Sequence, residues 1–331
     1  MNCRNFPHVR HLLTRHVIAI VCAMLAATGA ASAQYPSRVI KLIVPYPPAG
    51  VVDITGRLLA ERLQGQLHAT VIVDNRVGAA GTIGAGFVAR AAADGYTLLL
   101  TGAATQTFAP SLSKVLPYNP LTDFVPITQI TDGTLGLVVP VESSIKDLAG
   151  FVTAMKARGR DSNYASNGYG TYPHLAMELL KQSTGIEMTN VPFRGGNEAM
   201  TALLGGQVQV SLNHLPVILP LVRGGKLRVL ATSGMKRSPL LPDVPTLKES
   251  GYDVVASVWF GLFAPAGTPR SIVEQISAAV ARAAQDPVLK SKLLAQGDEV
   301  RAEGPDKFLA LEKSELQKWA PVIAKAGIVS N

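Results

Sequence analysis

The sequence contains few cysteines, few histidines and little charge. Both cysteines, Cys3 and Cys22, fall in the first 33 residues, so the rest of the chain offers no thiol for catalysis, no disulfide and no thiolate metal site. The six histidines stand in no HExxH or other metal-ligand spacing. We therefore expect no metal site in this protein.

The charge is low and dispersed. Charged residues make up 16% of the chain, whose formal net charge is +8. Three arginines of the leader, Arg4, Arg10 and Arg15, contribute to that excess, and the remainder carries about +5, a modest attraction for small anions. No run of Lys and Arg interleaves with aromatic residues, so we expect no nucleic-acid partner.

The first 33 residues have the pattern of a secretory signal peptide. The three arginines precede the apolar stretch 17–25, and Ala31-Ser32-Ala33 supplies a small-residue cleavage site. A membrane anchor is the alternative, but the apolar stretch is short for a spanning helix and passes into Ala, Thr and Gly. We expect cleavage between Ala33 and Gln34 and a periplasmic location.

The remaining chain, about 300 residues, is long enough for two lobes with separate cores. Short apolar runs alternate with helical patterns, which predicts an α/β fold of mostly parallel sheets with flanking helices. The same order restarts past residue 130. We predict that residues 34–132 plus 257–331 form lobe 1 and that residues 133–256 form lobe 2.

The stretch VPYPPAGVVDITGRLLAERL, residues 44–63, places a prolyl turn at the start of an amphipathic helix. Its three prolines have no amide donor, whereas residues 49–52 keep theirs, and the helix dipole adds partial positive charge at the same end. This combination forms a seat for a carboxylate or phosphate oxygen. The alternative is that water or Asp53 caps the helix. The spacing also predicts exposed ion pairs from Arg57 to Asp53 and Glu61.

A second helix start follows a strand at residues 165–174. Gly168 and Gly170 let the backbone approach a ligand, and Thr171 or Tyr172 stands at the cap. Two such helix starts in two lobes predict a ligand cleft between them. Asn213 follows the strand pattern 207–212, and its polar side chain stands where strand ends face a cleft, so it is a further candidate.

Other motifs are weaker. Residues 78–84 invite a dinucleotide interpretation, but the fingerprint fails at Ala79 and no acid follows at the required distance, so we predict a tight packing turn and no bound cofactor. We interpret His68, His174 and His214 as surface or capping residues. Neither a G-x-S-x-G elbow nor a phosphate loop is present, and no motif supports an enzyme.

A series of motifs resembles the Bug family of periplasmic solute receptors, which serve tripartite tricarboxylate transporters. The motifs are VPYPPAGVVD, VDNRVGAAGTIGA, DGYTLLL, SNGYGTYPHLAMELL, VPFRGGNEAMTALLGGQVQV, LPDVPTLKESGY and FGLFAPAGTP. The resemblance covers nearly all of the chain after the leader. It implies a two-lobed type II periplasmic binding-protein fold, and a monomer that captures a small organic carboxylate between its lobes and passes it to membrane permease subunits.

The resemblance also implies the residues that hold the ligand. With Asn213 from the strand-end argument, the predicted ligand-binding residues are Tyr46, Ala49, Gly50, Asp53, Thr105, Ser166, Gly168, Thr171, Tyr172 and Asn213. Two departures from the family pattern bear on ligand choice: Ala49 stands where the family usually has glycine, and the turn Gly-Ala-Ala-Gly at residues 78–81 is richer in alanine. A sensor accessory of a two-component system and a periplasmic enzyme acting on a carboxylate are the alternative functions.

Overall fold

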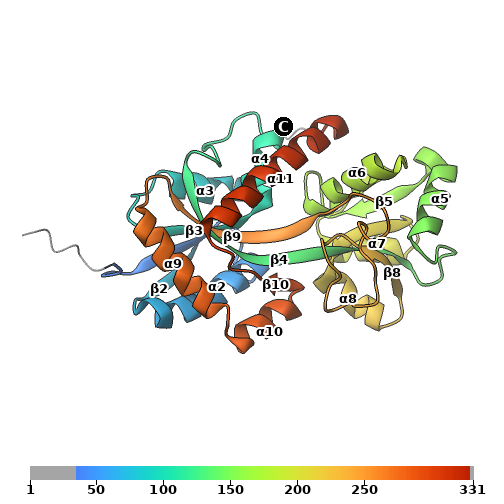
Figure 1. The fold of residues 1–331 in the computed structure, drawn as a ribbon. Coiled ribbons are helices and arrows are strands. Elements are labelled where there is room, and N and C mark those ends of the chain that lie inside the picture. The colour runs from blue at the N-terminus through green and yellow to red at the C-terminus, as the bar shows by residue number, and fades with distance from the viewer. Residues whose placement is uncertain (1–34, 329–331) are drawn as a thin grey trace, which may run out of the picture. The chain divides into compact units, whose positions relative to one another are not determined.

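The computed structural model describes residues 35–328, so the predicted signal peptide lies outside the described residues. By its internal contacts the chain divides into residues 1–37 and 38–331. The second of these units forms the α/β fold drawn in Figure 1.

The strands of the described chain join in one mixed sheet. Its order is β2-β1-β3-β9-β4-β7-β5-β6, and both β10 and β8 also pair with β4. The strands are β1 (Ile40–Val44), β2 (Val71–Asn75), β3 (Thr97–Gly102), β4 (Phe124–Pro140), β5 (Asn163–Ser166), β6 (Thr189–Pro192), β7 (Val210–His214), β8 (Leu227–Thr232), β9 (Ser257–Pro265) and β10 (Asp298–Val300).

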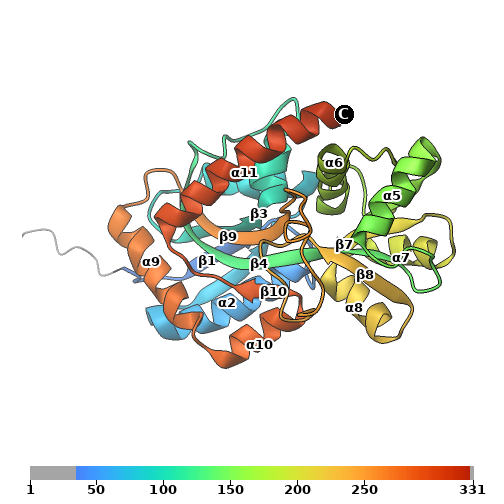
Figure 2. The same ribbon diagram turned by 45° about the vertical axis from the view of Figure 1, so that its right-hand side comes forward.

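Strands β4 and β9 link two groups of parallel strands. Strand β1 is parallel to β2 and β3, and β5 is parallel to β6 and β7, whereas β4 and β9 pair antiparallel with their neighbours. Strand β4 pairs with β9 as far as Thr134 and with β7 from Leu135 onward. Figure 2 shows β4 running between the two groups. The change of partner lies at the lobe boundary that the sequence predicts, although the division into lobes stays a prediction.

Helices flank the sheet. They are α2 (Val51–Leu67), α3 (Thr82–Ala89), α4 (Ala109–Leu112), α5 (Leu148–Arg158), α6 (Tyr172–Thr184), α7 (Gly196–Leu204), α8 (Leu215–Arg223), α9 (Arg270–Ala283), α10 (Pro287–Ala295) and α11 (Pro305–Ala326), with short 3₁₀ turns η1 (Ala79–Gly81) and η3 (Gly159–Asp161) and a π-helical turn η2 (Ala104–Phe108). Side chains of Asp147 and Asp286 cap α5 and α10 by accepting backbone N–H bonds. Gly185 ends α6 in a left-handed conformation, as the sequence predicts.

Two features of the fold differ from the sequence prediction. Helix α8 is not indicated by the pattern, because Pro216 and Pro220 interrupt it. Proline is tolerated in a first turn, where Pro216 lies, whereas Pro220 lies inside the helix. The buried face of α2 also differs from expectation: Asp53, which the spacing places in an exposed ion pair, is 2% exposed, whereas the apolar Ile54 is 37% exposed. The expected exposed ion pair between Asp53 and Arg57 therefore has one buried member.

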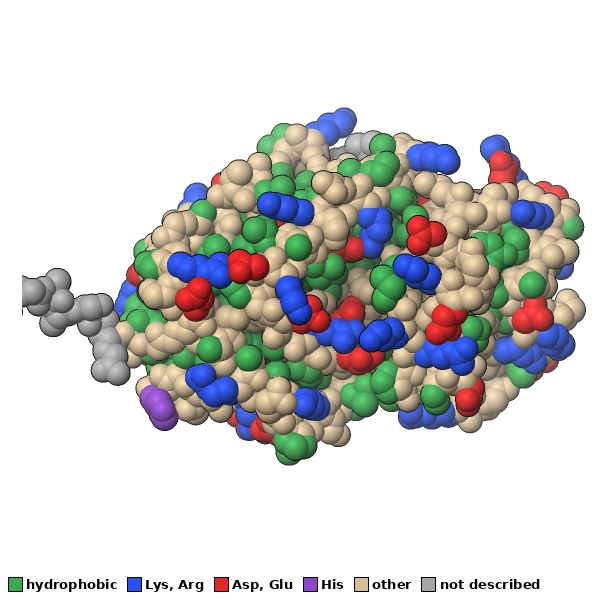
Figure 3. Space-filling view, in the orientation of Figure 1, with side chains coloured by type: hydrophobic (Ala, Val, Ile, Leu, Met, Phe, Trp, Pro, Cys, Tyr) green, Lys and Arg blue, Asp and Glu red, His purple; other side chains and the backbone are tan. Residues whose placement is uncertain are grey.

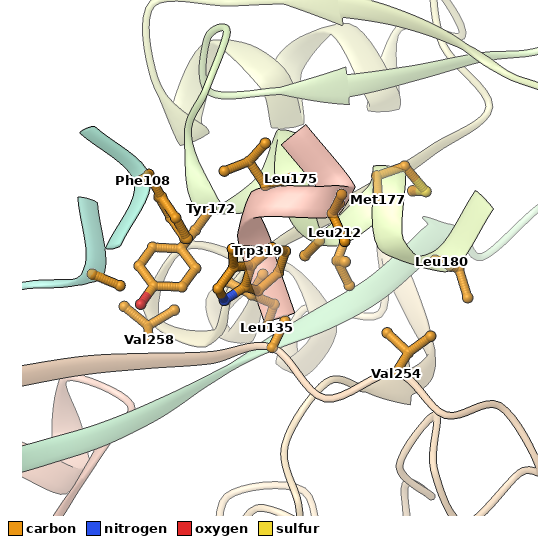
Figure 4. Close-up of a cluster of buried hydrophobic side chains, with 14 of the residues drawn as sticks. Phe108, Leu135, Tyr172, Leu175, Met177, Leu180, Leu212, Val254, Val258 and Trp319 are labelled. Carbon is orange, nitrogen blue, oxygen red and sulfur yellow. The ribbon is translucent and has the colours of Figure 1, made fainter. Parts of the chain in front are cut away.

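The hydrophobic core continues across the junction of the two strand groups. Phe108 of η2 packs edge-on against Tyr172 of α6 at a ring-centroid distance of 4.7 Å and against Trp319 of α11 at 5.3 Å. Leu135 of β4 and Val258 of β9 lie in the same cluster (Figure 4). Burying aromatic side chains of this size contributes strongly to stability, so this cluster holds α6 and α11 against η2.

In the part of the chain that the structure describes, no helix is long and apolar enough to cross a bilayer. On the face drawn in Figure 3, cationic and anionic side chains are interspersed. This distribution agrees with the dispersed charge of the sequence.

Candidate functional site

The loop before α2 is held by a buried carboxylate. Asp53 accepts bonds from the Ala49 amide and from Arg57 Nε, both at 2.9 Å, and from Asn75 Nδ2 at 2.9 Å. Asn75 also donates to the Tyr46 carbonyl at 3.1 Å. The Asp53 carboxylate thus reaches back to the residue before the N-cap Gly50, in the manner of a capping box.

These contacts decide between the two sequence-based roles of Asp53. Burial opposes ionisation of its carboxyl, but hydrogen bonds from Arg57, Asn75 and Ala49 outweigh burial and lower its pKa. Both carboxylate oxygens have protein partners. Asp53 therefore positions the loop, and the geometry gives it no direct part in holding an anion.

The start of α2 leaves amides available. The Gly50 amide bonds the Pro47 carbonyl at 3.3 Å, and the first helical bond runs from the Ile54 amide to Gly50. Among the described residues, no acceptor bonds the amides of Val51 and Val52. These two donors lie at the positive end of a 17-residue helix, where the sequence predicts an anion seat, and that role stays a prediction.

Thr105 lies beside this loop. It stands in the π-helical turn η2, and its hydroxyl is 2.8 Å from the Tyr46 hydroxyl and 3.3 Å from the Ala80 carbonyl. Burial raises the pKa of Tyr46, while hydrogen bonds to Thr101 and Thr105 act against that rise. The structure therefore brings Tyr46 and Thr105, which are far apart in sequence, into one hydrogen-bonded group.

The turn at residues 78–84 packs against this group. A Cβ atom on Gly81 would lie 2.7 Å from Thr105 Oγ1, and one on Gly84 would lie 2.8 Å from the Arg76 carbonyl oxygen. Both distances are too short for a side chain, so only glycine fits. The predicted tight packing turn is confirmed.

Both departures from the family pattern fall on strained backbone. Ala49 has φ of 63°, and Ala79 and Ala80 have φ of 44° and 52°. L-residues reach this left-handed region at a cost of roughly 1–2 kcal/mol, whereas glycine does not. The alanines are therefore held in place by the contacts around them.

The second predicted group gathers at the ends of β5 and β7. Ser166 is the last residue of β5, and its hydroxyl lies 3.4 Å from the Gly168 amide. Thr171 is the N-cap of α6, and its hydroxyl donates to the Gly168 carbonyl at 2.8 Å rather than capping the helix. These residues form a loop whose backbone is fixed from within.

Asn213 closes one side of this loop. Its side-chain amide pairs reciprocally with that of Asn167, with bonds of 2.9 and 3.2 Å, and it accepts the His214 amide at 2.9 Å. Asn213 is fully buried. It therefore joins the ends of neighbouring parallel strands, which agrees with the predicted strand-end position.

The Tyr172 side chain lies elsewhere. Its ring packs in the aromatic cluster with Phe108, and burial raises its pKa well above the usual range. Only its backbone amide, in the first turn of α6, remains for a ligand. The two groups of predicted residues nevertheless approach each other through η2 and α4, because Gly170 lies against Leu112 of α4.

Several supporting residues are absent from the predicted ligand-binding residues, and His174 among them is buried rather than at the surface. Asn75 stands at the end of β2 and Asn167 directly after β5. The feature that singles out Asn213, a polar side chain at a strand end, could have indicated both. His174 is 3% exposed, and its Nδ1 accepts the Gly170 amide at 3.0 Å. Within residues 35–328, no group of three His, Cys, Asp or Glu side chains could hold a metal ion.

Comparison with known proteins gives the family. A family model described as the tripartite tricarboxylate transporter family receptor matches residues 55–328. The chain belongs to this receptor family. It is 36% identical to Protein BugT of Bordetella pertussis over 317 residues, which span 94% of this chain and 97% of BugT. The family resemblance seen in the sequence is confirmed.

Solved structures of the receptor family share the fold. The structure of the periplasmic binding protein BugD is 32% identical, with a TM-score of 0.71, over 90% of this chain and 100% of that one. R. palustris Rpa4515 with adipate is 31% identical, with a TM-score of 0.75, over 89% and 99%. The α/β periplasmic binding-protein fold is therefore confirmed, and membership of a solute-receptor family removes the enzyme alternative.

Proposed function

We propose that this receptor captures a small organic carboxylate between its two predicted lobes and delivers it to the membrane subunits of a tripartite tricarboxylate transporter. The free amides of Val51 and Val52 carry the proposal, because they leave two donors unpaired at the positive end of α2. One carboxylate oxygen binds there. The loop at the start of α6, with Ser166, Gly168 and Thr171, contacts the ligand from the other lobe.

Two further observations support a carboxylate. A relative with 31% identity is described with bound adipate, a dicarboxylate. The Asp53 carboxylate already has three donors of its own, so the start of α2 is preorganised and need not reorganise when an anion binds. Preorganisation of this kind raises affinity because less conformational freedom is lost on binding.

A thermal-shift screen of mono-, di- and tricarboxylates tests ligand class. A ligand at 100 times its dissociation constant adds about 2.7 kcal/mol to stability, which moves the melting temperature measurably. Mass spectrometry of the recovered ligand checks that it is retained unchanged. A screen in which no carboxylate raises the melting temperature would contradict the proposal.

Proline substitution tests the helix seat. Val51 is the first residue of α2, and Gly50 before it is extended, with φ of −77° and ψ of 165°, so Val51→Pro removes the amide without disturbing the helix. Losing one hydrogen bond to a charged group costs about 1.5–3 kcal/mol, or ten- to a hundredfold in affinity. Val51→Ala keeps the amide and is the matched control. Equal affinity of the two variants for the ligand would place the anion elsewhere.

Delivery is a separate step with its own test. Cells that carry the membrane subunits but lack this receptor should take up the ligand only after the receptor gene is restored. Uptake that is independent of the receptor would limit its role to binding.

A further inference from the structure

His174 occupies an unusual place in the loop at the start of α6. It is the third residue of the helix, is 3% exposed, and accepts the Gly170 amide through Nδ1 at 3.0 Å. The ring lies near two tyrosines, with centroid distances of 5.4 Å to Tyr169 and 6.4 Å to Tyr164. A ring nitrogen that accepts must be unprotonated, so this bond exists only for the neutral imidazole.

Gly170 transmits this bond to the loop. It has φ of 70°, and on its other side a Cβ atom would lie 2.8 Å from Leu112 Cδ1. Its amide is directed to His174, and the neighbouring Thr171 hydroxyl binds the Gly168 carbonyl. The Gly170 backbone is therefore tied to one titratable nitrogen, while other bonds hold the rest of the loop.

The groups facing His174 are few. Glu178, one turn later in α6, accepts from the Tyr164 hydroxyl at 2.7 Å and from Lys181 at 2.7 and 3.0 Å. Burial lowers the pKa of His174 and is the largest effect. The charge of Glu178 raises this pKa, and the charge of Lys181 lowers it. With burial dominant, the imidazole is neutral near pH 7, and acid is needed to charge it.

We propose that His174 is a positioning residue whose neutral ring holds the Gly168–Thr171 loop in its binding shape, so that acidification releases the loop and weakens ligand binding. This proposal rests on the proposed function for the ligand, but the loop contact stands independently. Once Nδ1 carries a proton, two N–H donors face each other at 3.0 Å, and the Gly170 amide loses its acceptor.

Two substitutions separate the hydrogen bond from the charge. His174→Asn places a non-titrating acceptor near the position of Nδ1, and His174→Leu removes the acceptor. His68→Asn is the control, because His68 is exposed and its left-handed backbone at the end of α2 tolerates asparagine.

The first measurement needs no ligand. Amide hydrogen exchange of Gly170, corrected for the intrinsic pH dependence, should lose protection by about tenfold between pH 7.5 and pH 5 in the unmodified receptor. Protection should stay constant in His174→Asn and be low at both pH values in His174→Leu. If the protection of the Gly170 amide in the unmodified receptor does not change with pH, the proposal is overturned.

The second measurement uses adipate as the probe. We expect the dissociation constant of the unmodified receptor and of His68→Asn to rise about tenfold more over this pH range than that of His174→Asn, because protonation of adipate itself affects all three equally. An equal pH dependence in the unmodified receptor and His174→Asn, or tighter binding in acid, overturns control of the ligand by His174. If the receptor binds no adipate at any pH, the proposed function is wrong for this dicarboxylate. The exchange measurement on Gly170 then decides by itself whether His174 holds the loop.

Discussion

The Asp53 carboxylate accepts the amide of Ala49 at 2.9 Å, and Ala49 itself has a left-handed backbone with φ of 63°. The bond ties the loop to the helix it precedes, and it offsets the strain of a methyl-bearing residue in a conformation that favours glycine. The strained residue, Ala49, and the carboxylate that holds it, Asp53, thus lie four residues apart. Both stand at the N-terminal end of α2, where we place the ligand carboxylate.

Ala49→Gly should raise the free energy of unfolding by about 0.5–1 kcal/mol, because relief of the left-handed strain exceeds the added freedom of the unfolded chain. Chemical denaturation measures this change. Ala310→Gly is the control: Ala310 is exposed within helix α11, where glycine should lower stability by about 1 kcal/mol. A loss of stability in both variants would show that Ala49 is unstrained.

Asp53→Ala should lower the free energy of unfolding by about 1–3 kcal/mol, because it removes a buried carboxylate that accepts bonds from the Ala49 amide, Arg57 and Asn75. Affinity for the carboxylate should fall as well, since the loop loses its anchor. Asp161→Ala, at an exposed residue of η3, should change stability by no more than about 0.5 kcal/mol. Unchanged stability of Asp53→Ala would show that these hydrogen bonds do not hold the loop in the fold.

The sequence predicts the elements around the site better than the contacts within it. The start of α2 and the end of β5 follow from prolines, glycines and apolar runs, which act locally. The burial of Asp53 depends on Asn75, which reaches it only because β2 pairs with β1. That pairing is not encoded within either stretch, so the residue spacing of α2 wrongly predicts that Asp53 is exposed.

The same limit applies to the second group of residues. A histidine without a metal-ligand spacing is ordinarily a surface or capping residue, and its sequence pattern does not show that His174 is buried in the fold. Helix α8 is not predicted because its prolines lower the local helix propensity. Its apolar contacts in the fold override that penalty. Packing decides both cases.

Gly81→Ala should be strongly destabilising, because φ is 93° and the new Cβ would lie 2.7 Å from Thr105 Oγ1. Strain and overpacking together should cost about 2–4 kcal/mol and displace Thr105 from Tyr46. Gly185→Ala is the matched control: φ is 71° and nothing lies within 4 Å of the new Cβ, so only the strain of about 1 kcal/mol applies. Equal losses in thermal denaturation would mean that the contact with Thr105 is easily relieved.

A buried carboxyl on β10 makes stability depend on pH in the opposite sense from an ordinary acid. Asp298 is 5% exposed and pairs with Gly133 of β4, next to Asp132. Burial, and then the charge of Asp132, raises its pKa to about 8. The folded protein therefore keeps a proton that the unfolded chain releases near pH 3.8.

The stabilising contribution of Asp298 should be complete below about pH 4 and be lost as the pH rises through about 8, because the ionised carboxylate is disfavoured in the fold. Asp298→Asn keeps the site neutral, so its melting temperature relative to the unmodified protein should increase from about pH 4 to about pH 8 and level off above that. Asp161→Asn, which changes an exposed acid, should show no such trend. A difference between Asp298→Asn and the parent that stays constant over this range would show that Asp298 is already ionised at neutral pH, with its charge compensated in the fold.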